Sequence, residues 1–392
     1  MTSSNGYLSK RRKQRRLLVS AVGIFAAVCF AAFSSGAPGA GSATAAAAAT
    51  STGQSSQAQK AATFLKAYET PPSKITITAP LKSAPPTGKS LFYLQCEQPQ
   101  CQVVGVGVKA AATMAGWSFT SIPFVSTNPA TLVTGLNQAL QEGATAVAII
   151  AEPYAVWSSV VPKFQAAHVP IVAMFVGPAT TGSTVIANVP DPAFSALNGK
   201  ILADWFISDS HARGDVLLAN VPDYPYLGLV GDSFASNVHK ACSACKETTV
   251  NVGIPDVASG AINSEIVSAL QKNPSIKYVM VADAAFVPAL PGALAAAGLN
   301  GKVKVIGCCA AAAEESGLAS GQFAALTVTG SNYPGFLAVD AALRHLEGLP
   351  IPSNEGQPPI GFLTRSSKFV PTNTWDVPSN YAAQFKTLWK LR

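Results

Sequence analysis

The chain of 392 residues is 48% hydrophobic and 12% charged, with 27 basic and 20 acidic residues. This composition excludes a disordered protein and is ample for two or three domains with buried cores. The net charge of +7 does not indicate a nucleic-acid partner, because six of the basic residues lie within residues 10–16 and the other 21 nearly balance the acids. We therefore expect no nucleic acid among its partners.

The N-terminus has the pattern of an export signal. Basic residues at 10–16 precede a mostly apolar stretch over residues 17–33, and small residues follow. We therefore predict that residues 1–45 are a signal peptide or an anchor, and that the rest of the chain lies outside the cytoplasm. Three variants stay open: a twin-arginine signal at Arg15-Arg16, an uncleaved membrane anchor of near-minimal length, and lipid attachment at Cys29.

A flexible tether is expected between this signal and the folded part. Residues 38–60 are mainly Gly, Ala, Ser, Thr and Gln, and two proline pairs follow at 71–72 and 85–86. Such a composition is typical of a linker. We therefore assign residues 46–88 to a tether and expect folded sequence from about Lys89.

From Lys89 onward, short apolar runs alternate with amphipathic stretches. Asn128-Pro129 and Asp191-Pro192 each place a capping residue before a proline at the first helical position. Strands that are apolar throughout predict parallel sheets covered on both faces, and ligands bind such sheets beyond the carboxyl ends of the strands. Because the number of these βα units is larger than one sheet would hold, we predict a doubly wound α/β fold with two lobes. The predicted strands are 91–94, 118–124, 145–151, 170–175, 215–220, 248–252, 277–282, 303–307, 325–329 and 360–363.

The order of these segments resembles a known family, the sugar-type periplasmic solute-binding proteins of ABC importers, in particular the ribose-binding group. The resemblance covers roughly residues 89–363 and rests on the order and spacing of several local cues. The cues are Pro99 in the first ligand loop, Gly107 and Gly116-Trp117 in and after the first helix, Asn128-Pro129, residues 138–150 (QALQEGATAVAII), residues 169–172 (VPIV) and residues 277–298 (KYVMVADAAFVPALPGALAAAG).

The resemblance implies two Rossmann-like lobes, each a parallel sheet covered by helices, joined by a three-segment hinge with a ligand cleft between them. We expect the N-terminal lobe to comprise residues 89–189 and 330–359, and the C-terminal lobe residues 190–329 and 360–368, with 369–392 as a terminal segment that covers a lobe. The implied protein is a monomer that binds a small-molecule ligand, delivers it to an ABC permease in the membrane, and needs no cofactor. A ligand-sensing receptor for a membrane kinase or chemoreceptor is the alternative.

At the family's ligand positions this sequence departs from the sugar-binding pattern. Gln98 falls on an asparagine, and Gln100 and Cys101 fall on two phenylalanines. Most importantly, the Asp-Arg pair that clamps sugar hydroxyls falls on Phe175-Val176. Aromatic surface without an arginine favours a ligand less polar than a free hexose, although a sugar binder with unusual cleft chemistry remains an alternative.

The candidate ligand-binding residues combine these positions with polar and aromatic residues in neighbouring loops. Carboxylates in the set could engage hydroxyl groups or an amine. The full set is Glu97, Gln98, Gln100, Glu152, Tyr154, Phe175, Asp223, Tyr224, Tyr226, Asp283, Phe286, Cys309, Asn332 and Tyr333.

Six cysteines follow the signal, and their even number in an exported chain indicates disulfides. Cys96 and Cys101 would close a short ring in the first ligand loop. The other candidates are Cys242, Cys245, Cys308 and Cys309. Zinc binding at His239 with Cys242 and Cys245 would need a second half-site, which the sequence does not offer clearly, so we expect no metal. A redox role for this C-x-x-C would need it at the start of a helix, where the thiolate is stabilised, and it lies late in a predicted helix, so we expect no redox centre.

The sequence contains no G-x-S-x-G, H-E-x-x-H or P-loop motif. We therefore expect a binding protein and not an enzyme.

Overall fold

The computed structural model describes residues 41–178, 181–310, 312–367 and 375–392. The chain divides into two units, Met1–Ala46 and Ala47–Arg392. Only the last six residues of the first unit are described, as the start of helix α1 (Gly41–Leu65). The predicted export signal, with Cys29, otherwise lies outside the described residues. Within the described part, we find no helix with the length and apolar character needed to span a bilayer.

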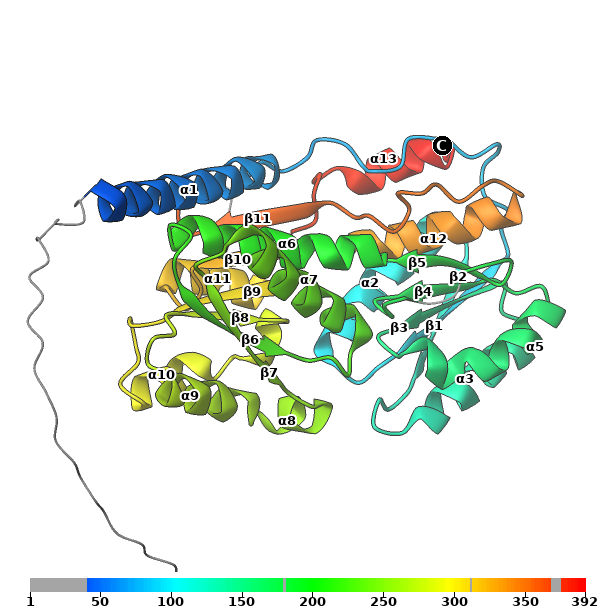
Figure 1. Ribbon diagram of the computed structural model, residues 1–392. Coiled ribbons are helices and arrows are strands. Elements are labelled where there is room, and N and C mark those ends of the chain that lie inside the picture. The colour runs from blue at the N-terminus through cyan, green and yellow to red at the C-terminus, as the bar shows by residue number, and fades with distance from the viewer. Residues whose placement is uncertain (1–40, 179–180, 311, 368–374) are drawn as a thin grey trace, which may run out of the picture. The chain divides into compact units, whose positions relative to one another are not determined.

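The N-terminal lobe contains a parallel sheet of five strands in the order β2-β1-β3-β4-β5. Its inner strands are buried almost throughout, as expected for a parallel sheet covered on both faces. In Figure 1, helices α2 and α12 lie on one side of this sheet and α3 and α5 on the other. The strands are β1 (Ser90–Gln95), β2 (Ser118–Pro123), β3 (Ala146–Ile150), β4 (Ile171–Met174) and β5 (Val185–Val189).

The helices of this lobe include α12 and α13 from the C-terminal part of the chain. Asn128 and Pro129 begin α3 as the sequence predicts, although the Asn128 side chain makes no capping hydrogen bond. The helices are α2 (Pro99–Met114), α3 (Pro129–Gln141), α4 (Tyr154–Trp157), α5 (Val161–Ala166), α12 (Tyr333–Leu346) and α13 (Tyr381–Leu388), with a 3-10 turn η2 (Ser158–Val160).

The C-terminal lobe contains a sheet of six strands in the order β11-β10-β9-β8-β6-β7. Five strands are parallel, and the edge strand β11 runs antiparallel to β10. This edge strand differs from the all-parallel expectation because the chain reaches it on its last return from the other lobe. The strands are β6 (Asp215–Asn220), β7 (Lys246–Asn251), β8 (Tyr278–Val281), β9 (Lys304–Ala310), β10 (Ala325–Thr329) and β11 (Ile360–Thr364).

Helix α6 lies on one side of the second sheet, and α9 and α10 lie on the other (Figure 1). The Asp191 carboxylate accepts a hydrogen bond from the Phe194 N–H at 2.7 Å, so the predicted cap of α6 is present. The helices are α6 (Pro192–Asp209), α7 (Pro225–Ala241), α8 (Ile254–Ser259), α9 (Ile262–Lys272), α10 (Leu290–Ala296) and α11 (Ala312–Ser320), with a 3-10 turn η3 (Ala284–Phe286).

The three segments that join the lobes lie between β5 and α6, between β10 and α12, and before β11. The first and third touch, because the Asp191 N–H donates to the Gly356 carbonyl at 2.7 Å. At the second, Asp376 accepts hydrogen bonds from the Asn332 N–H at 3.0 Å and from its side-chain amide at 2.6 Å. The predicted two-lobed α/β fold with a three-segment hinge is therefore present.

The segment expected to be a tether is structured instead. Helix α1 buries Ala61 and Leu65 in the core of the C-terminal lobe, and a short 3-10 turn, η1 (Lys66–Tyr68), follows it. Further along, Ile75, Ile77 and Leu81 are buried in the core of the N-terminal lobe. The overall composition of the segment, rich in small polar residues, did not indicate that these few apolar side chains would be buried. Their burial holds the segment in place.

The C-terminal segment likewise contributes to both cores. Trp375 and Val377 are buried in the C-terminal lobe, whereas Phe385, Leu388 and Trp389 are buried in the N-terminal lobe. The sequence predicts that this segment covers one lobe. In the structure it is part of the core of each.

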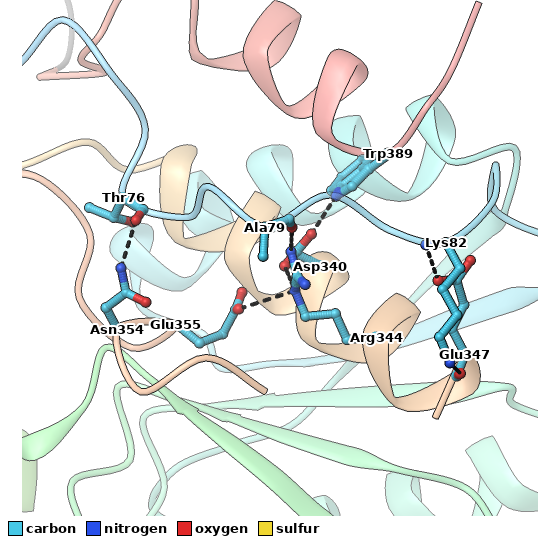
Figure 2. A network of polar contacts seen from close by, with 9 residues as sticks. All are labelled: Thr76, Ala79, Lys82, Asp340, Arg344, Glu347, Asn354, Glu355 and Trp389. Atoms are coloured by element: carbon cyan, nitrogen blue, oxygen red, sulfur yellow. Dashed lines mark hydrogen bonds and ion pairs between the residues drawn. The ribbon is translucent and has the colours of Figure 1, made fainter. Parts of the chain in front are cut away.

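A buried polar network connects these terminal segments to α12 (Figure 2). Arg344 forms an ion pair with Asp340 at 2.5 Å and lies 3.7 Å from Glu355, and its guanidinium donates to the Ala79 carbonyl at 2.6 Å. Nearby, the Asn354 amide donates to the Thr76 carbonyl at 2.6 Å. The network therefore attaches the residues before β1 to the N-terminal lobe.

Candidate ligand-binding site

A pocket of about 630 Å³, open to solvent, lies between the two lobes. Its lining comes from both cores, and Phe175 packs against each of them. The lining residues are Cys96, Gln98, Gln100, Cys101, Ile150, Ala151, Phe175, Tyr224, Tyr226, Leu227, Asp283, Phe286 and Cys309.

These residues lie at or just beyond the carboxyl ends of parallel strands. Gln98 follows β1, Phe175 follows β4, and Asp283 follows β8. Tyr224 and Tyr226 lie at the start of α7, after β6. Such strand ends are where open α/β sheets bind ligands, because the loops there can carry variable side chains on a rigid frame.

Three lining residues have left-handed backbone conformations, which non-glycine residues rarely adopt. They are Ala151, Phe175 and Cys309, with φ angles of 67°, 51° and 63°. Each such residue costs on the order of 1–2 kcal/mol, so it persists only where the surrounding structure imposes it. At these three positions the backbone conformation helps to direct side chains from the sheet ends into the pocket.

Aromatic rings from both lobes meet in this pocket. The rings of Phe175 and Tyr226 are 5.2 Å apart and edge-on, so a residue of the N-terminal lobe touches one of the C-terminal lobe. Tyr224 and Phe286 lie 6.1 Å apart in a tilted arrangement. These pairs make the lining predominantly apolar.

Asp283 is the charged residue of the lining. One of its carboxylate oxygens accepts a hydrogen bond from the Ala285 N–H at 2.9 Å. Burial raises the pKa of Asp283 to about 7, against the effect of this hydrogen bond, and the nearby carboxylate of Glu314 adds to the rise. The group therefore titrates near neutral pH, where it can either donate or accept a hydrogen bond.

The six cysteines of the folded part come together as three pairs. The Cα atoms of Cys96 and Cys101 are 5.6 Å apart, and those of Cys242 and Cys245 are 5.4 Å apart. Cys308 and Cys309 are neighbours in the chain. Two of the pairs contribute to the pocket lining, and Cys309 Sγ lies 3.9 Å from the Tyr226 hydroxyl.

Eight of the fourteen candidate residues line the pocket. They share a position at or directly after a strand end, as the parallel-sheet rule predicts. They are Gln98, Gln100, Phe175, Tyr224, Tyr226, Asp283, Phe286 and Cys309.

Three further candidates, all acidic, lie near the pocket without lining it. Glu97, Glu152 and Asp223 are close enough to Tyr224 for their charges to raise its pKa, although burial of the phenol is the larger cause. Glu152 is itself buried, and burial is the main reason why its pKa is raised.

The remaining three candidates do not line the pocket. Tyr333 is fully buried in the N-terminal lobe, and its hydroxyl accepts a hydrogen bond from the Thr76 N–H. The side-chain amide of Asn332 donates to Asp376. The ring of Tyr154 packs edge-on against Trp157, at 4.8 Å. Each of these side chains takes part in core or hinge packing.

Five lining residues were not among the ligand candidates. Cys96 was considered only as part of a cysteine pair, Cys101 fell on a ligand position of the family but was kept only as a disulfide candidate, and Leu227 is an ordinary apolar helix residue. Ile150 and Ala151 could have been predicted as lining residues, because they end a predicted strand and the carboxyl ends of parallel strands form the ligand-facing edge of the sheet.

The model of the family described as "Periplasmic binding protein domain" matches residues 95–350. The chain belongs to this family. Its members are substrate-binding transport proteins located outside the cytoplasm, not enzymes. No curated protein sequence matches this chain.

Solved structures of periplasmic binding proteins share this fold. A substrate-binding protein of a sugar ABC transport system from Bordetella parapertussis 12822 has a TM-score of 0.63 and 18% identity, covering 78% of this chain and 96% of that one. An ABC transporter solute-binding protein from Agrobacterium vitis, bound with α-D-tagatopyranose, has a TM-score of 0.59 and 19% identity, covering 76% and 98%. One from Burkholderia graminis C4D1M, in complex with D-arabinose, has a TM-score of 0.59 and 17% identity, covering 74% and 100%.

In the part of this periplasmic binding protein that the structure describes, no three His, Cys, Asp or Glu side chains are arranged so that they could hold a metal ion. The pocket between its lobes can bind a molecule by apolar contact and by a few hydrogen bonds. The family and the fold support a solute-binding function.

Proposed function

We propose that this protein captures a small, partly apolar molecule in the pocket between its lobes and delivers it to an ABC import permease. The observation that carries the proposal is the position of Phe175. At the end of β4, where the resemblance to sugar-binding proteins implies an Asp-Arg clamp, this chain places an aromatic ring against Tyr226 of the other lobe.

The pocket lining supports a ligand less polar than a free hexose. Hydroxyl groups of a buried sugar need polar partners, and an unpaired buried polar group costs about 1–3 kcal/mol. The lining offers Gln98, Gln100 and Asp283 as polar residues with flexible or charged ends, and most of the other surface is aromatic, aliphatic or sulfur. A ligand with one or two hydrogen-bonding ends on an apolar body matches this distribution.

The three cysteine pairs are proposed to be disulfides, as expected for a protein exported to an oxidising compartment. The pairs Cys96–Cys101 and Cys308–Cys309 would then give two sides of the pocket a fixed shape. The terminal region before Gly41 is proposed to be the export signal or membrane attachment, and the protein is proposed to act as a monomer.

A thermal-shift screen of the purified full-length protein tests the ligand class. Monosaccharides form one half of the library, and small aromatics, terpenoids and amines form the other. A ligand at 100 times its dissociation constant stabilises the folded state by about 2.7 kcal/mol, which is a readily measured rise in Tm. Hits confined to the apolar half support the proposal, whereas a monosaccharide as the strongest hit contradicts it.

Uptake of a radiolabelled hit by cells with and without the gene tests delivery to a permease. Loss of uptake in the deletion strain, restored by the wild-type gene, is the expected result. Unchanged uptake together with a changed transcriptional response to the compound would instead indicate a sensing receptor.

A further inference from the structure

The charges around the pocket have one sign. Asp283 lies in the lining, and Glu97, Glu152 and Asp223 are near enough to Tyr224 to raise its pKa. Glu314 is in turn near enough to Asp283 to raise the pKa of that carboxyl. The lining contains no Lys, Arg or His. The pocket therefore has a negative electrostatic potential.

Three of these carboxylates, those of Glu97, Asp223 and Asp283, accept hydrogen bonds from backbone N–H groups. Glu97 accepts from the Ser126 N–H at 3.0 Å, Asp223 from the Ile254 N–H at 3.3 Å, and Asp283 from the Ala285 N–H. Among the described residues, none of the three, nor Glu152, forms an ion pair with a basic side chain. Elsewhere in the described part of the chain, the buried Asp340 is paired with Arg344, whereas these pocket carboxylates have no such cation beside them.

Aromatic rings add a second attraction for positive charge. Phe175, Tyr224, Tyr226 and Phe286 all line the pocket. The face of an aromatic ring is electronegative and attracts ammonium groups within about 6 Å of its centre. Rings and carboxylates together are the combination that recognises an organic cation, whereas an anion would be repelled and would gain no counter-ion.

We propose that the ligand is a protonated amine on an apolar or aromatic body, with its ammonium group facing Asp283 and its body packed among the rings of Phe175, Tyr224 and Phe286. This inference rests on the proposed function, because it takes the pocket between the lobes as the ligand site. It narrows the ligand to one charge class. The half-buried carboxylate of Asp283 is ready to ionise as the cation enters, since its pKa of about 7 falls when a positive charge is placed beside it.

Three probes of nearly equal shape test the charge class on the full-length wild-type protein. They are 2-phenylethylamine, 2-phenylethanol and 3-phenylpropionate, measured by isothermal titration calorimetry at pH 8. We expect the amine to bind at least tenfold more tightly than the alcohol, and the carboxylate to bind more weakly than both. An alcohol that binds as tightly as the amine overturns the inference.

Substitutions test the role of Asp283. In Asp283→Asn, the amine should lose at least tenfold in affinity and the alcohol less than threefold. Asp232→Asn, an exposed aspartate on α7, is the matched control and should change neither value. Equal affinity of Asp283→Asn and wild type for the amine overturns this role. The comparison of probes on the wild type stands by itself if the variant fails to fold.

The probes also separate this inference from the proposed function. If the alcohol or an uncharged compound of the screen binds and no amine does, the inference fails and solute binding stands. If neither the probes nor any compound of the screen binds, both fail.

Discussion

The indole N–H of Trp389 donates a hydrogen bond of 2.6 Å to the carboxylate of Asp340, a residue fully buried in the middle of α12 (Figure 2). The other oxygen of the same carboxylate is paired with Arg344. Because Arg344 also contacts Glu355 and the Ala79 carbonyl, one helix holds three distant parts of the chain.

Loss of this guanidinium should be strongly destabilising. Arg344→Leu leaves Asp340 and Glu355 buried without a cation, and breaking such a pair costs about 3–5 kcal/mol. Lys304→Leu is the control, because its ion pair with Asp209 is half-exposed and such pairs contribute about 0–1 kcal/mol. Urea denaturation of both variants gives the two free energies. Equal losses would show that the buried network contributes no more than a surface pair.

The aromatic rings of the pocket should determine affinity. Phe175→Ala and Tyr224→Ala should each weaken binding of a screen hit at least tenfold, or about 1.4 kcal/mol, because each removes a ring that the ligand would contact. Tyr154→Ala, whose ring packs on Trp157 outside the pocket, should bind as wild type. Calorimetric titration of the three variants measures their affinities. Unchanged affinity in both pocket variants would place the ligand elsewhere.

Stability should fall as the pH rises through neutrality. Glu315 is 1% exposed and neither carboxylate oxygen has a hydrogen-bond partner among the described residues. Burial, with Glu314 and Asp376 nearby, raises its pKa to about 8, whereas an unfolded chain releases this proton near pH 4 (about 4.3). The folded state thus binds more protons between these pH values, and the free energy of unfolding decreases from about pH 4 to pH 8.

Thermal denaturation from pH 5 to pH 9 measures this effect. The neutral side chain of Glu315→Gln removes the ionisation, so its Tm should decrease less with pH than that of the wild type. The exposed control Glu142→Gln should follow the wild type. If the Tm of Glu315→Gln fell with pH as steeply as that of the wild type, the Glu315 carboxyl would not be the cause of the pH dependence.

Reduction of the cysteine pairs should weaken ligand binding through two specific pairs. Cys96–Cys101 and Cys309 belong to the pocket lining, whereas Cys242–Cys245 follows α7 and does not. The double variant Cys96→Ser/Cys101→Ser should therefore lose affinity for a hit, and Cys242→Ser/Cys245→Ser should not. Peptide mapping under non-reducing conditions checks the pairing itself, and free thiols at all six positions would refute the disulfides.

Apolar periodicity was sufficient to predict most of the fold. Every predicted strand is present. Inner strands such as β3 and β4 are buried on both faces and are therefore apolar without interruption, whereas the edge strands β2 and β7 are largely exposed and more polar. Strand β5 was missed, since Val185–Val189 is a short run at the edge of its sheet and contains Asn188. The direction of β11 also could not be read from its residues, because it depends on where the chain returns from the other lobe.

The site was predictable where it follows from local position, and not where it depends on packing between distant segments. Phe175 ends a predicted strand, Gln98 and Asp283 follow predicted strands, and all three line the pocket. Tyr333 was assigned to the same site by proximity along the chain. Its hydroxyl instead meets Thr76, from a segment whose composition predicted a tether, so no local pattern could reveal that contact.

The burial of both terminal segments sets the minimal folding unit. The region that defines the family, residues 95–350, ends well inside the structure. A chain cut to residues 89–368 would lose Leu65, Ile77 and Leu81 at one end and Trp375 and Trp389 at the other, all of them buried. Each lobe would then present an apolar gap to water, and such a fragment would aggregate although it contains the whole pocket. Expression boundaries for this protein must therefore be chosen from its cores and not from the extent of its family resemblance.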